Sequence, residues 1–74
     1  MGLVTLREMA GKTRREVAAC LQMTVHGVRR IEIGGDTSIS TLEAYSQAIG
    51  VDFTVAYNAH RLTRSSAAAP ANVS

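Results

Sequence analysis

A turn of three residues between two helix-like stretches constrains most strongly how this chain can fold. The first stretch, residues 13–21, opens with Thr13 and carries Glu16 three residues later, which is the reciprocal pattern of a capping box. The second stretch, residues 25–33, follows after residues 22–24 alone, and three residues leave room only for a tight turn. Two short helices joined in this way predict a helix-turn-helix.

Two further segments have helical spacing and flank this pair. Residues 3–10 place leucines and an alanine on one face and end at a glycine. A later helix is predicted to begin at Ser40, with Glu43 as its reciprocal cap, and to stop at Gly50. We expect Ile39, in the loop before it, to plug the core.

After Gly50 the spacing of apolar residues changes from helical to alternating. Apolar side chains occupy every second position over residues 51–57, which predicts a strand. A lone strand cannot satisfy its own backbone hydrogen bonds, so it needs a second copy of the chain or a different protein. We favour a homodimer, because antiparallel pairing across a two-fold axis removes both exposed edges. The residues on the apolar face are Val51, Phe53, Val55 and Tyr57.

The chain length of 74 residues allows one small domain. The predicted fold is mainly all-α, a small helix-turn-helix bundle of four to five short helices over residues 1–58, ending in the strand. Residues 59–74 are predicted to form a flexible tail, in which His60 has no special role. The last ten residues are rich in alanine and serine and are expected to be disordered.

Several classes of protein and site are not expected from the composition. Cys20 is the only cysteine, which excludes an intramolecular disulfide and a cysteine-rich zinc site. The two histidines lie far apart, so we expect no metal site, and nothing indicates a cofactor. The chain has no nucleophile–base pair or phosphate loop of an enzyme. It has no run of ~20 apolar residues and no signal peptide, so we expect a cytoplasmic protein without membrane contact.

Charge is divided unevenly along the chain. Residues 1–30 carry six basic and two acidic side chains, whereas residues 31–60 carry four acidic side chains and no lysine or arginine. The net charge of +2 therefore conceals a basic half and an acidic half. A basic half that contains a helix-turn-helix predicts an anionic partner on that side, and double-stranded DNA fits it.

The stretch from Thr13 to Gly34 reads Thr-Arg-Arg-Glu-Val-Ala-Ala-Cys-Leu-Gln-Met-Thr-Val-His-Gly-Val-Arg-Arg-Ile-Glu-Ile-Gly. It resembles the phage-repressor (XRE, Cro-like) helix-turn-helix family, whose pattern is Thr-Gln-x-Glu-Leu-Ala, a turn ending in Val-Ser, then Val-Ser-x-Ile-Glu-x-Gly. The match continues from Ser40 to Gly50 and covers about residues 3–50. It implies a sequence-specific transcriptional repressor that acts as a dimer. Its two recognition helices, Val25–Ile33 in each copy, would enter the major groove about 34 Å apart.

The chain departs from the family pattern in the turn and in both helices. Arg14 stands where the family has a glutamine that reaches a phosphate, and arginine can make this contact with added charge. Gln22 stands where the turn commonly has glycine, and a left-handed glutamine costs about 1 kcal/mol. The recognition helix begins Val25-His26-Gly27, and we expect the glycine to let the backbone approach the groove closely.

The resemblance and the charge pattern together predict the DNA-binding residues. Arg29 is the candidate for a bidentate guanine contact, His26 for a purine or a phosphate, and Val25 for a thymine methyl group. Phosphate contacts are expected from Arg14, Arg15 and Arg30. For Arg14 and Arg15 a solvated helix face is the alternative, and for His26 an ordinary surface position. The predicted DNA-binding set is Arg14, Arg15, Thr24, Val25, His26, Arg29 and Arg30.

Two charged residues are assigned to structure instead. In the family, residues at the positions of Arg7 and Glu32 form an ion pair that ties the first helix to the end of the recognition helix. Removing one partner from such a partly buried pair costs more than the pair itself contributes.

A narrower resemblance, to antitoxins of the HigA type, rests on Ile39-Ser-Thr-Leu-Glu-Ala-Tyr45, Ala48-Ile-Gly50 and the alternating residues that follow. It implies an alternative function: binding and neutralising an RNase toxin and autoregulating the shared operon. A basic toxin partner would be attracted to the acidic half, and the strand would extend its sheet. The acidic residues are Glu32, Asp36, Glu43 and Asp52.

Overall fold

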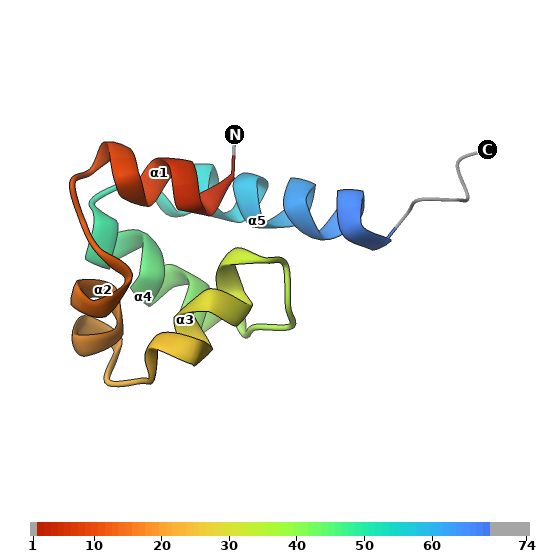
Figure 1. Ribbon diagram of the computed structural model, residues 1–74. Coiled ribbons are helices and arrows are strands. Elements are labelled where there is room, and N and C mark those ends of the chain that lie inside the picture. Colours follow the sequence, from red (N-terminus) through yellow and green to blue (C-terminus); the bar gives the residue numbers. More distant parts are fainter. Residues whose placement is uncertain (1, 69–74) are drawn as a thin grey trace.

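The computed structural model describes residues 2–68, and this part of the chain folds into five helices (Figure 1). They are α1 (Leu3–Met9), α2 (Arg14–Leu21), α3 (Val25–Glu32), α4 (Ile39–Ile49) and α5 (Phe53–Ala68). Figure 1 shows α1 alongside the first half of α5, with α2, α3 and α4 grouped on one side of this pair. The predicted all-α helix-turn-helix bundle of four to five short helices is confirmed.

The ends of α2 and α3 follow the sequence signals. The Thr13 hydroxyl accepts a hydrogen bond from the Glu16 backbone N–H at 3.1 Å, and the Glu16 carboxylate accepts one from the Thr13 N–H at 2.7 Å. The Thr24 hydroxyl caps α3 by accepting a bond from the Gly27 N–H at 3.0 Å. Gln22 ends α2 in the left-handed conformation with φ of 55°. The turn between the two helices is therefore built by local hydrogen bonds.

The start of α4 differs from the prediction. Ser38, and not Ser40, is the N-cap, because its hydroxyl accepts a bond from the Thr41 N–H and its carbonyl accepts one from the Leu42 N–H. The helix consequently begins at Ile39. This isoleucine lies on the outer flank of the first turn with 59% of its surface exposed, so the expectation that it plugs the core is wrong.

The strand predicted over Val51, Phe53, Val55 and Tyr57 is wrong, because α5 begins at Phe53. A helix pairs its backbone groups within the segment and needs no partner strand. The inward positions follow helical spacing: Ala56 and Ala59 are buried, while Val55 and Tyr57 are exposed. The alternation of residues 51–57 was too short to exclude a helix whose buried face is made of alanine.

The boundary predicted at residue 58 falls inside α5, because residues 59–68 continue this helix. Of the last ten residues, which were expected to be disordered, residues 65–68 belong to α5, and positions 69–74 lie outside the described residues. His60 is buried, and its Nε2 lies 3.0 Å from the carbonyl oxygen of Gly35, just after α3. This histidine therefore fastens α5 to the loop that follows the recognition helix.

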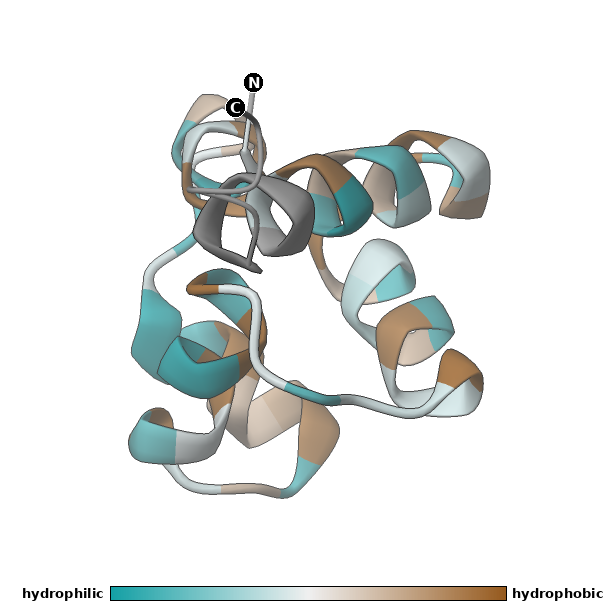
Figure 2. Cartoon of the chain, turned by 90° about the vertical axis from the view of Figure 1, so that its right-hand side faces the viewer, coloured by the Kyte–Doolittle hydropathy of each residue, from teal (hydrophilic) through white to brown (hydrophobic). Residues whose placement is uncertain are grey.

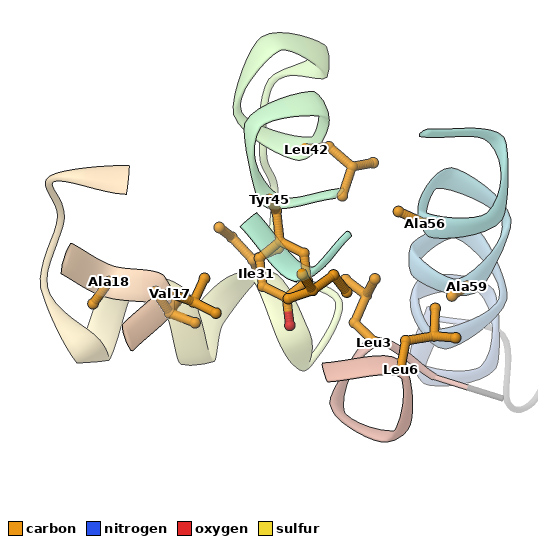
Figure 3. Close-up of a cluster of buried hydrophobic side chains, with 11 residues drawn as sticks. Leu3, Leu6, Val17, Ala18, Ile31, Leu42, Tyr45, Ala56 and Ala59 are labelled. Atoms are coloured by element: carbon orange, nitrogen blue, oxygen red, sulfur yellow. The ribbon is translucent and has the colours of Figure 1, made fainter. Parts of the chain in front are cut away.

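The core lies where the five helices meet. Figure 3 shows Tyr45 of α4 between Ile31 and Leu42, while Leu3 and Leu6 of α1 approach Ala59 of α5. Figure 2 shows hydrophobic and hydrophilic segments on each helix, as expected for helices that bury one face. Alanine at the inward positions of α5 lets α1 pack closely against it.

The helical assignment of α5 can be tested with two adjacent substitutions. Ala56→Leu should lower the free energy of unfolding by about 1–3 kcal/mol, because a fully buried site must accept extra volume. Val55→Leu, at an exposed site, should change it by less than about 0.5 kcal/mol. Urea unfolding followed by circular dichroism measures both. A strand with Val55 inward would reverse the order of the two effects.

Candidate nucleic-acid interface

The Glu32 carboxylate joins four helices at one point. Its Oε2 accepts a hydrogen bond from Nε of Arg7 in α1 at 2.7 Å and another from the Tyr45 hydroxyl in α4 at 2.6 Å. Its Oε1 accepts a bond from Nε of Arg14 in α2 at 2.8 Å. The ion pair between Arg7 and Glu32 that the family resemblance implied is thus present. We call the group Arg7, Arg14, Glu32 and Tyr45 the Glu32 cluster.

Burial and hydrogen-bond donors shift the pKa of the Glu32 carboxyl group in opposite directions. The Glu32 side chain is fully shielded from solvent, and burial by itself raises the pKa of a carboxyl group. The hydrogen bonds donated by the rest of the Glu32 cluster outweigh burial and hold the pKa of Glu32 below its ordinary value of 4.5. The same environment raises the pKa of Tyr45, first through burial and then through its bond to Glu32. The tyrosine therefore remains a donor.

Removal of the Tyr45 hydroxyl measures what this group contributes to the free energy of unfolding. Tyr45→Phe should lower the free energy of unfolding by about 1.5–3 kcal/mol, because it deletes a buried hydrogen bond to a charged group. Thermal or urea unfolding at neutral pH provides the measurement. Tyr57→Phe is the matched control, since Tyr57 is exposed and should give a change near zero. Equal effects of the two substitutions would contradict this account.

The lowered pKa of Glu32 predicts loss of stability in acid. A carboxyl group whose pKa is lower in the folded state stabilises the fold above its unfolded value of about 4.5 and loses this contribution below it. The melting temperature should therefore fall as the pH drops below about 4.5. Glu32→Gln should be less stable at neutral pH and show a flatter acid limb. Glu43→Gln, at an exposed site on α4, should keep the wild-type slope.

The outward face of α3 carries basic side chains. Val28, Ile31 and Glu32 are the buried residues of this helix. At about 100° per residue, His26 and Arg30 lie opposite them and one turn apart. Both are exposed. These two side chains therefore point most directly away from the bundle.

Arg29 and Val25 occupy one flank of α3 instead. Arg29 is exposed and lies one turn before Glu32, the residue to which the guanidinium of Arg14 is bonded. The Arg14 side chain is 35% exposed, although its Nε is bonded to Glu32. Arg15 is exposed beside it at the start of α2. Accessible arginines thus stand on the first turn of α2 and on the recognition helix, and the bond from Arg14 to Glu32 links these two helices.

Gly27 lies on the other flank of α3 and is half-buried. A Cβ atom built on it would stand 2.7 Å from the terminal methyl of Met23. The space beside this glycine is thus taken by Met23, which does not support our expectation that it serves close approach to DNA.

The sequence prediction missed two features of this site. For Arg14 it offered a phosphate contact or a solvated helix face, whereas Arg14 pairs with Glu32 across 18 positions of sequence. It also did not identify the Tyr45 hydroxyl as a donor to Glu32. A tyrosine at a buried helical position signals that its hydroxyl has a polar partner, although not which one.

Within residues 2–68, no group of three or more histidine, cysteine or acidic side chains is arranged to hold a metal ion. None of the helices described is long and apolar enough to cross a membrane. Cys20 is exposed on α2.

Comparisons with known proteins agree with this geometry. A family model described as helix-turn-helix matches residues 3–55, which confirms the resemblance of the chain to the XRE type. No curated protein and no solved structure matches the chain. The narrower resemblance to HigA-type antitoxins stays a prediction.

Proposed function

Because the chain belongs to the XRE-type helix-turn-helix family of DNA-binding transcription regulators, we propose that it is a sequence-specific repressor that binds its operator as a dimer. The observation that carries this proposal is the basic outer face of α3. Two exposed side chains, His26 and Arg30, lie there one turn apart, opposite the buried face. The major groove is wide enough for one such helix.

The geometry of α3 favours an exchange of roles between its two arginines. Arg30, which points directly outward, becomes the candidate for the bidentate guanine contact, with His26 beside it on a neighbouring base. Arg29 lies toward Arg14 on the flank and suits a phosphate of the strand that borders the groove. Val25 on the same flank remains a candidate for a thymine methyl group. Arg15 and Thr24, the N-cap of α3, complete the proposed contacts to the DNA backbone.

A hollow between α4 and α5 supports the proposed dimer. A hollow of about 220 Å³ opens there, with exposed Ile39 and Tyr57 on its rim. Arg61 also borders it, and Glu43 lies one turn after Ile39 on α4. A surface with a hollow, protruding apolar side chains and charges of both signs suits contact with its own copy. The homodimer we propose therefore uses α5 as a helix, in place of strand pairing.

The second candidate function is that of a HigA-type antitoxin, favoured by the exposed acidic residues Asp36, Glu43 and Asp52. Two features that supported it are weaker. The segment meant to extend a toxin's sheet is the start of α5, and Glu32 is buried in its cluster. We therefore keep the toxin partner as the hypothesis to pursue if DNA binding proves unspecific.

Selection from random-sequence duplexes tests the proposed function. We expect enrichment of an inverted repeat whose half-site centres lie about 34 Å apart, one for each recognition helix. Arg30→Ala should remove the preference at one or two base pairs of each half-site, a loss of about 1–3 kcal/mol. Arg29→Ala should weaken binding to all duplexes alike and reduce the salt slope by about one. Electrophoretic shifts at several salt concentrations measure these effects.

Other outcomes would reject parts of the proposal. Enrichment of an asymmetric site would reject the dimer but retain specific binding. Loss of base preference with Arg29→Ala and not with Arg30→Ala would restore the roles predicted from sequence. Weak binding without enrichment would reject the repressor, and the search would move to a basic protein partner.

A further inference from the structure

We infer that Glu32 is a positioning residue for DNA-backbone binding, because it holds the guanidinium of Arg14 as a fixed two-pronged donor for one phosphate. This inference rests on the proposed function. The inference adds to the proposed function a role for Glu32, a buried acidic residue that does not itself touch DNA.

The two oxygens of Glu32 have different partners. Oε2 accepts bonds from Arg7 and Tyr45, which lie in the core at exposed fractions of 7% and 0%. Oε1 accepts the bond from Arg14. The core thus fixes the carboxylate, and the carboxylate in turn fixes Arg14.

The bond from Arg14 to Glu32 uses Nε, which is the nitrogen nearest the backbone. It does not occupy the four N–H bonds on the two terminal nitrogens of the guanidinium. These terminal groups are coplanar and can donate to two oxygens of a phosphate. A flexible arginine loses side-chain entropy when it binds, and anchoring Nε in the free protein reduces that loss.

The position of Arg14 agrees with this role. It is the first residue of α2, directly after the Thr13 cap, and its side chain is 35% exposed. Its guanidinium reaches Glu32, which lies one turn after Arg29 on α3, and Arg29 is exposed on the flank of that helix. A DNA strand that borders the groove entered by α3 would pass along this flank.

The substitution Arg14→Lys separates geometry from charge. Lysine keeps the charge but has a single nitrogen, so it cannot bind Glu32 and hold a phosphate in two-pronged fashion. Arg15→Lys is the matched control, because Arg15 is the exposed next residue and has no hydrogen bond to Glu32. We expect Arg14→Lys to weaken binding about tenfold. Arg15→Lys measures the cost of the same exchange at a proposed phosphate contact without an anchor, and its loss should be smaller, about two- to threefold.

The measurement is the dissociation constant for two duplexes of equal length, the selected operator and a scrambled sequence, between about 50 and 200 mM salt. Arg14→Lys should affect both duplexes by the same factor and leave the salt slope unchanged, since the number of cations is unchanged. Arg14→Gln should reduce the slope by about one. Circular dichroism melting shows whether each variant is folded at the temperature of the binding assay.

Glu32→Asp tests the positioning residue directly. The shorter side chain keeps the charge but withdraws the carboxylate from Arg14, so DNA binding should weaken as in Arg14→Lys. The double variant, Glu32→Asp with Arg14→Lys, should bind DNA little more weakly than either single variant. If this variant does not fold, the comparison of Arg14→Lys with Arg15→Lys decides alone.

Three results would overturn the inference. Equal losses for Arg14→Lys and Arg15→Lys would mean that anchoring by Glu32 adds nothing. A loss confined to the operator duplex would make Arg14 a reader of bases. Additive effects of Glu32→Asp and Arg14→Lys would make the two residues independent. Failure of the proposed function is a separate result, seen when the wild-type protein binds neither duplex.

Discussion

The buried carboxylate of Glu32 is the interaction on which the relative placement of the helices depends. Removing an ionised carboxylate from water is costly, so the cluster is stable only because both oxygens have donors at 2.6–2.8 Å. These donors come from α1, α2 and α4, while Glu32 itself ends α3. A shift of any one of these helices would leave a charge or a hydroxyl without its partner. A polar cluster of this kind specifies one arrangement of an otherwise aliphatic core.

The same cluster explains why a small aliphatic core is enough to orient α3. Val28 and Ile31 anchor this helix through apolar contacts, which tolerate some sliding along the interface. Hydrogen bonds to Glu32 are directional and do not tolerate it. Just beyond the same end of α3, the hydrogen bond between His60 and the Gly35 carbonyl fastens the segment that follows the helix. The recognition helix therefore has a polar anchor on its last turn and another just beyond it.

How well each feature of the fold could be predicted depends on how far apart in sequence the interacting residues lie. The caps formed by Thr13 and Thr24 depend on residues three positions away, and the capping box of Thr13 and Glu16 was predicted from sequence. The family pattern indicated the Arg7–Glu32 pair. The Arg14–Glu32 bond spans 18 positions at a place where the chain departs from that pattern, so no local or family signal pointed to it.

After Gly50 a local signal led to a wrong prediction, because the alternating apolar residues indicated a strand where the chain forms α5. Val51, Phe53 and Val55 alternate with smaller or polar residues, but the choice between strand and helix was decided by tertiary contacts. Ala56 and Ala59 give α5 a flat face on which α1 can lie closely, and such a face has little hydrophobic signal in sequence. His60 follows on the same face and reaches Gly35, a contact 25 positions apart. Only the packed structure therefore distinguishes α5 from a strand.

The charge balance of the Glu32 cluster connects the fold to binding. Two guanidinium groups face one carboxylate, so the cluster carries a net charge of +1. Arg7 is buried and its pKa is raised: burial alone would lower it, but the bond to Glu32 outweighs burial. The surplus charge is therefore presented by Arg14, the arginine that reaches solvent. A phosphate placed there would balance the two cations with two anions. A cluster that holds the helices together thus leaves an unmatched positive charge on the surface beside α3.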